Sequence, residues 1–205
     1  MTESTAPLSK ARAEQSKRRR FETLAGVSFL AGAAEFLLVT MIAESLYPAY
    51  NVRDQVLSEL GVGQVALLWN ASLFLLGVAV IFGGYFAYRS MASRLSVSLS
   101  FILGIGCMGA AIFPLDSPIG VHGLFTFLAF AAGGLFALTS YRVVGSKGMK
   151  SFSIIFGVYS LVSVVLHAFN VNLGLGGGGM ERMIVFPLVV WLSAFGGYLL
   201  NTRNA

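Results

Sequence analysis

Residues 17–43 read KRRRFETLAGVSFLAGAAEFLLVTMIA, a basic cluster followed at once by an apolar run. The apolar part, from Leu24 to Ala43, is long enough to cross the roughly 30 Å hydrocarbon core of a bilayer as a helix. It is longer than the core of a typical signal peptide, and it ends at Glu44 without a small-x-small cleavage motif. We therefore predict a retained first transmembrane helix.

The rest of the chain repeats this apolar pattern. Of the 205 residues, 56% are hydrophobic and 11% are charged, whereas about a quarter of the residues of a soluble domain are charged. Apolar runs of about 20 residues predict six membrane spans, with the limits 21–43, 64–88, 95–113, 120–142, 151–172 and 183–200. The predicted fold is an all-α polytopic membrane protein, a six-transmembrane-helix bundle. A basic tail (1–20) precedes a single transmembrane domain (21–203).

Lysine and arginine are distributed unequally between the two sides of this predicted bundle. With the N-terminus in the cytoplasm, 12 of the 14 basic residues lie on the inner side, and only Arg53 and Arg182 lie on the outer side. This positive-inside bias predicts a multi-pass cell-membrane protein with both termini cytoplasmic. It also assigns the basic tail to anionic lipid headgroups, so the expected partner is the lipid bilayer and not nucleic acid.

Two familiar kinds of site are not expected. The single cysteine, Cys107, lies in an apolar stretch and has no second cysteine with which to form a disulfide or a zinc cluster. The glycine run at 174–179 has the spacing of a dinucleotide-binding motif, but no strand precedes it. We expect this run to be a flexible outer loop.

The longest outer connection, residues 44–63, contains a candidate short amphipathic helix. Asn51 is suited to cap it and Gly61 to end it. Its apolar positions fall on one side and are Val52, Val56, Leu57 and Leu60. Such a helix would lie flat on the membrane or cover the outer mouth of the bundle.

Polar residues inside the spans are candidate site residues, because burying them in lipid is costly. In four spans, polar or small residues recur at spacings of three and four and so share one helix face. These faces are Ser28, Gly32 and Glu35; Asn70, Gly77 and Gly84; His122, Thr126, Ala129 and Gly133; and Ser153, Gly157, Ser160, Ser163, His167 and Asn170. We expect them to point into the bundle, although such stripes also serve simple helix packing.

Both histidines and most of the acidic residues that follow the tail fall in the predicted outer half, where they define an outward-facing polar cavity. Glu35 lies deep enough in its span to need a proton, a partner or a metal ion. Asp116 precedes Ser117 and Pro118, a turn and helix cap, so a structural role competes with a catalytic one. Glu181 and Arg182 are compatible with a local ion pair at the start of the last span.

Five segments follow one another along the chain in a characteristic order: 47–52 (YPAYNV), 57–61 (LSELG), 113–116 (FPLD), 122–123 (HG) and 181–182 (ER). Together they resemble the archaeal and bacterial membrane family known as domain of unknown function 998. The resemblance implies the six-helix topology. It marks Ser58, Glu59, Asp116, His122, Glu181 and Arg182 as matching positions. The chain departs from the family pattern at Ala49, where glycine is expected.

The preferred functional hypothesis is a site in the outer leaflet that binds or processes a lipid or isoprenoid-like ligand. In its enzymatic form, an intramembrane metal-dependent hydrolase, the catalytic residues are Asp116, His122 and Glu35, and the metal ligands are His122, His167 and Asp116. The ligand-binding candidates are Ser58, Glu59, Asn70, Asn170, Glu181 and Arg182, with Arg182 facing an anionic headgroup.

Two alternatives remain open at the level of sequence. One is a haem b protein in which His122 and His167 supply the axial ligands, although their estimated depths differ by about 7 Å. The other is a non-catalytic protein that binds or transports a small solute. The sequence identifies neither a cofactor nor an enzymatic activity.

Overall fold

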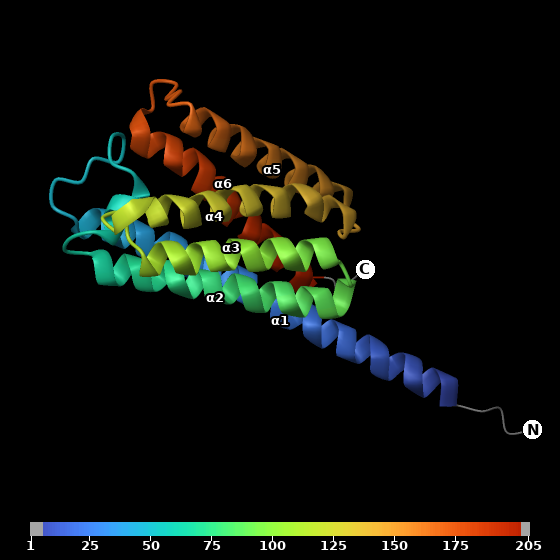
Figure 1. Cartoon of the computed structure of the whole chain (residues 1–205). Coiled ribbons are helices and arrows are strands. Elements are labelled where there is room, and N and C mark those ends of the chain that lie inside the picture. The colour runs from blue at the N-terminus through green and yellow to red at the C-terminus, as the bar shows by residue number, and fades with distance from the viewer. Residues whose placement is uncertain (1–5, 202–205) are drawn as a thin grey trace, which may run out of the picture.

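The computed structural model describes residues 6–201 as a bundle of six long helices (Figure 1). They are α1 (Ala6–Leu46), α2 (Ala66–Met91), α3 (Arg94–Ile112), α4 (Val121–Thr139), α5 (Lys147–Ala168) and α6 (Gly176–Asn201). All six are long and apolar enough to cross a membrane, and these residues contain no strand. The predicted six-span, all-α fold is therefore confirmed.

The helices run up and down and form a closed ring. Each helix packs on its neighbours along the chain, and α1 also packs on α6. A smaller contact joins α4 directly to α6, which leaves α5 on the outside of the ring. The connections 47–65, 113–120 and 169–175 lie at one end of the bundle, called the site end below, and the start of α1 and the end of α6 lie at the other (Figure 1).

Glycine residues allow the helices to approach closely. A Cβ atom on Gly77 of α2 would lie 2.6 Å from the carbonyl oxygen of Gly104 on α3. A Cβ on Gly157 of α5 would lie 2.4 Å from the backbone nitrogen of Leu138 on α4. Both distances are too short for any side chain, so these members of the predicted stripes serve helix packing.

Four members of the polar stripe of the fifth span are buried, namely Ser153, Gly157, Ser160 and Ser163, and two of them join helices. Ser153 Oγ accepts a hydrogen bond from Trp191 Nε1 of α6 at 3.0 Å. Ser160 Oγ donates to the carbonyl oxygen of Ile184, also on α6, at 3.2 Å. Both serines are fully buried. Their hydrogen-bonding capacity is therefore used in holding α5 against α6.

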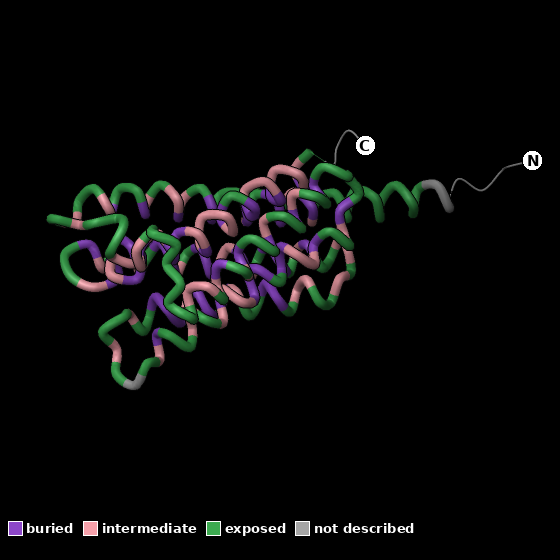
Figure 2. Tube along the Cα trace, turned by 90° about the horizontal axis from the view of Figure 1, so that it is seen from above, coloured by how far each residue is buried: buried purple, intermediate pink, exposed green. Residues whose placement is uncertain are grey.

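The first helix extends well beyond the predicted span. Residues 9–20 of the basic tail are exposed and continue α1 without a break, projecting from the bundle (Figures 1 and 2). An ion pair joins Arg18 Nε to Glu22 Oε1 at 3.0 Å, one helical turn apart. Residues 1–5 of the predicted tail and 202–205 of the chain lie outside the described residues.

The last helix also begins earlier than predicted. It starts at Gly176 and not at residue 183, so residues 176–179 of the glycine run form its first turn, and only residues 174–175 belong to the connection. A Cβ on Gly178 would lie 2.1 Å from the carbonyl oxygen of Gln55, and the Gly179 N–H donates to the carbonyl oxygen of Arg53 at 3.1 Å. Glycine is required here because the two backbones touch.

The connection between α1 and α2 contains the predicted short helix, but in a shorter form. Asn51 organises a turn, in which its Oδ1 accepts from the Arg53 N–H at 3.0 Å. The helix η1 (Leu57–Gly61) follows as a five-residue 3-10 helix. Leu57 and Leu60 are 1% and 0% exposed. Of the two placements expected for this segment, it covers the mouth of the bundle and does not lie flat on a surface.

Candidate functional site

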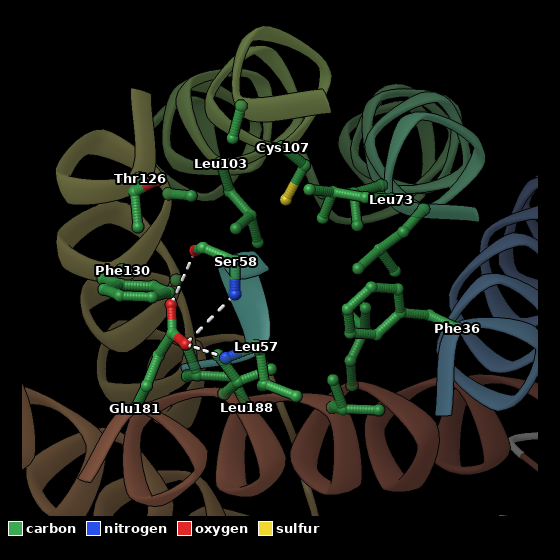
Figure 3. Close-up of a pocket in the computed structure, with 18 of the residues that line it drawn as sticks. Phe36, Leu57, Ser58, Leu73, Leu103, Cys107, Thr126, Phe130, Glu181 and Leu188 are labelled. Carbon is green, nitrogen blue, oxygen red and sulfur yellow. Dashed lines mark hydrogen bonds between the residues drawn. The ribbon is translucent and has the colours of Figure 1, made fainter. Parts of the chain in front are cut away.

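A cavity of about 80 Å³ lies inside the ring, beneath η1 (Figure 3). Side chains from α1, α2, α3, α4 and α6 line it, whereas no described residue of α5 does. Its walls are almost entirely apolar, and the larger side chains include Phe36, Leu73, Leu103, Phe130 and Leu188. The cavity is therefore an apolar chamber with one end closed by the first connection.

Glu181 of α6 fixes η1 in this position. Its Oε1 accepts from Ser58 Oγ at 2.8 Å, and its Oε2 accepts from the Leu57 N–H and from the Ser58 N–H at 3.3 Å (Figure 3). Glu181 and Ser58 are 4% and 6% exposed. Three donors compensate for the burial of this carboxylate. The same hydrogen bonds join η1, which covers the cavity, to α6, which forms part of the cavity wall.

Arg182, the next residue of α6, secures the part of the connection that precedes η1. Its Nε and Nη2 donate to Glu44 Oε1 at 3.1 and 2.6 Å, and Nη2 also donates to the Tyr50 hydroxyl at 2.8 Å. Its Nη1 donates to the carbonyl oxygens of Val52, Gln55 and Gly178 at 2.9, 3.0 and 2.8 Å. A guanidinium has five N–H groups. These partners occupy all of them and leave none for an anionic headgroup.

Tyr50 lies between Arg182 and the backbone of the connection. Its hydroxyl accepts from Arg182 and donates to the carbonyl oxygen of Val56 at 2.9 Å. Burial raises the pKa of Tyr50 to about 12, although the hydrogen bond from Arg182 acts in the opposite direction. The phenol therefore stays neutral and keeps its proton for Val56.

His122 of α4 is the most informative polar residue of the cavity wall. Its Nδ1 lies 2.8 Å from the carbonyl oxygen of Phe113. A carbonyl only accepts, so in the neutral ring Nδ1 carries the hydrogen and Nε2 carries a lone pair. His122 is 5% exposed, and no described residue is hydrogen-bonded to Nε2.

Two further polar atoms of the wall are buried without a partner in residues 6–201. They are Oγ1 of Thr126, one turn along α4 from His122, and Nε1 of Trp69 on α2. Leaving a buried donor or acceptor unpaired costs about 1–3 kcal/mol. Three residues of the cavity wall, His122, Thr126 and Trp69, thus each carry a buried polar atom whose hydrogen-bonding capacity is unused.

The structure brings some of the predicted site residues together and separates others. Ser58, His122 and Glu181 line the cavity, and Arg182 lies immediately behind it. The remaining predicted site residues do not line the cavity. Two of them bind within the chain: Glu59 accepts a hydrogen bond from Gln55, and Asn70 donates to the Gly61 carbonyl oxygen. Asp116, in the turn before η2 (Pro118–Gly120), and Asn170, after α5, are exposed, whereas Glu35 and His167 are half-buried.

The predicted metal ligands are not assembled, and of the two predicted haem ligands only His122 lines the cavity. Within residues 6–201, no group of three His, Cys, Asp or Glu side chains is arranged to hold a metal ion. All three predicted metal ligands belong to the site end, but Asp116 is in an exposed turn and His167 belongs to α5, which does not line the cavity. A place at the same end of the bundle does not imply a place in the same cavity.

Sequence reasoning missed several residues that build the site. In the sequence, Glu44 marks only the end of the first apolar run, yet it pairs with Arg182, 138 positions away. Trp69 had no periodic pattern to mark it. Thr126, in contrast, belongs to the predicted face of the fourth span, and all four members of that face line the cavity: His122, Thr126, Ala129 and Gly133.

The comparisons with known proteins identify a family. The family described as protein of unknown function (DUF998) matches residues 30–198. This region contains the cavity, η1 and both residues that anchor the first connection. No curated protein and no solved structure matches the chain.

Proposed function

The chain belongs to the DUF998 family, and for this member we propose a binding function, in which one end of a lipid or isoprenoid-like molecule occupies the cavity beneath η1. The observation that carries this proposal is an apolar chamber whose wall contains three unpaired buried polar atoms. An apolar chain gains from leaving water. A polar end group that pairs those atoms would remove the cost of leaving them unsatisfied.

The size of the cavity limits how much of such a molecule it receives. Its volume is about 80 Å³, roughly half that of an engineered apolar cavity of about 150 Å³ that binds benzene. The cavity therefore suits an end group and a short apolar segment. The rest of the molecule would extend between the helices into the bilayer.

The charge distribution of the sequence indicates from which side this molecule comes. Twelve of the 14 basic residues fall on the side of the termini, so we propose that the termini are cytoplasmic and that the site end faces outward. The ligand would then be taken from the outer leaflet of the cell membrane. Arg182 is already saturated, so its role in this proposal is to hold the connection that roofs the cavity.

Filling the cavity tests the proposal directly. The sulfur of Cys107 on α3 points into the chamber (Figure 3), so Cys107→Phe places a ring where the ligand would lie. Ile105→Phe is the matched control, because Ile105 is on the same helix but, as a whole residue, is 50% exposed at the surface of the bundle. The measurement is native mass spectrometry of each purified protein after incubation with a total lipid extract from the expression host.

We expect the unmodified protein and Ile105→Phe to retain a bound lipid, and Cys107→Phe to retain about tenfold less, which corresponds to roughly 1.4 kcal/mol. Circular dichroism and thermal unfolding of both variants establish that they are folded. Equal retention by the two variants, or no retention by the unmodified protein, would contradict the proposal.

A further inference from the structure

We propose that the polar end group held in this cavity is an uncharged alcohol, whose hydroxyl donates to His122 Nε2 and accepts from Thr126 or Trp69. This inference rests on the proposed function and specifies the chemical class of the ligand. It follows from the donors and acceptors that the cavity wall leaves unpaired, taken one at a time.

His122 requires a donor. Its Nδ1 is committed to the carbonyl oxygen of Phe113 at 2.8 Å, so the neutral ring offers a lone pair at Nε2. Nε2 is buried, and the described chain supplies no donor to it. A ligand atom that pairs with His122 must therefore carry a hydrogen.

The other two atoms add a need for an acceptor. Trp69 Nε1 is a donor only, and the hydroxyl of Thr126 both donates and accepts. Neither has a partner within residues 6–201. A hydroxyl group combines one donor with two acceptor lone pairs. It is the smallest uncharged group that meets both requirements.

Charged end groups fit less well. A carboxylate or a phosphodiester has no hydrogen for His122, and it would enter a chamber whose wall already contains the buried carboxylate of Glu181. No lysine or arginine is among the described lining residues, so a second anion would be buried without a counter-ion. An ammonium donates but cannot accept, and would leave Trp69 Nε1 unpaired.

The test compares four probes that have the same twelve-carbon chain: 1-dodecanol, 1-methoxydodecane, dodecanoate and dodecylamine. The protein is reconstituted in phosphatidylcholine nanodiscs, and the dissociation constants are measured by tryptophan fluorescence at equal mole fractions of probe. Both tryptophans, Trp69 and Trp191, line the cavity. The methyl ether keeps the acceptor of the alcohol but has no hydrogen to donate.

We expect 1-dodecanol to bind about 3- to 10-fold more tightly than the ether, which is the contribution of one buried hydrogen bond, and more tightly than the two charged probes. His122→Phe should remove the difference between alcohol and ether, whereas the control His167→Phe should preserve it, because His167 does not line the cavity. If His122→Phe does not fold, the ratio in the unmodified protein decides the question alone.

Two outcomes would overturn this inference and are distinguishable from failure of the proposed function. If the ether binds as well as the alcohol, or if dodecanoate or dodecylamine binds more tightly than the alcohol, the assignment of an alcohol is wrong but the cavity is still a binding site. If none of the four probes binds, the proposed function fails as well.

Discussion

Arg182→Met tests whether one buried arginine holds the first connection onto the bundle. The change keeps an unbranched apolar side chain but removes all five N–H donors. It leaves the Glu44 carboxylate, the Tyr50 hydroxyl and three backbone carbonyl oxygens without their partner. The side chains of Arg182 and Glu44 are 8% and 17% exposed. Breaking a buried pair costs about 3–5 kcal/mol, and because Glu44 is partly accessible we expect a loss of about 3 kcal/mol.

The assay is equilibrium unfolding in mixed detergent micelles, followed by tryptophan fluorescence. Arg53→Met is the matched control, since Arg53 lies in the same connection with an exposed side chain, and its effect should stay within about 0.5 kcal/mol. Glu44→Gln completes a double-mutant cycle. The double variant should lose little more than Arg182→Met, because both single changes remove the same contact.

A free energy of unfolding of Arg182→Met within about 0.5 kcal/mol of that of the unmodified protein would show that this arginine does not hold the connection. If the losses of the two single variants simply added, the two side chains would contribute independently, and the contact between them would be refuted. Hydrogen exchange at residues 57–61 gives a second measurement. Protection there should fall in Arg182→Met and not in Arg53→Met.

Two further predictions concern the same connection. Ala49 has a φ of +57°, a backbone conformation that costs an L-residue about 1–2 kcal/mol. Glycine avoids this cost but loses more conformational entropy on folding, so Ala49→Gly should raise the free energy of unfolding by about 0.5–1 kcal/mol. A lower melting temperature of the variant would contradict this prediction. The pKa of Tyr50 is raised from 10.0 to about 12, so its contribution to stability is complete below pH 10 and is lost as the pH rises through 12. The tyrosinate absorbance that disappears in Tyr50→Phe should therefore titrate near pH 12, and a step near pH 10 would show that the phenol is not buried.

The helices, and one face of the site, could be predicted from sequence because they depend on local patterns. An apolar run of about 20 residues has few alternatives to a membrane-crossing helix. On α4, the spacing of His122, Thr126, Ala129 and Gly133 selects one side of the helix, and all four residues line the cavity. The expectation of glycine in place of Ala49 also corresponds to a physical requirement, a positive φ.

The parts that were predicted wrongly depend on contacts between distant segments. Glu181 and Arg182 are charged, and adjacent charged residues are typical of a segment in contact with water. The predicted last span therefore begins after them, at residue 183. They are in fact buried within α6, because the first connection supplies their partners. The glycine run was interpreted as a loop for a similar reason. Nothing local to residues 176–179 shows that the backbone of residues 52–55 lies against them.

The continuous helix α1 has a consequence for the basic tail. Phe21 stacks on Phe86 of α2, near the point where α1 leaves the bundle, and Lys10 precedes Phe21 by 11 residues. At about 1.5 Å per residue, a straight helix places Lys10 about 16 Å beyond that point. The Debye length at physiological salt is only about 8 Å. The basic residues 17–20 therefore lie within one Debye length of the end of the bundle, whereas Lys10 and Arg12 lie beyond it.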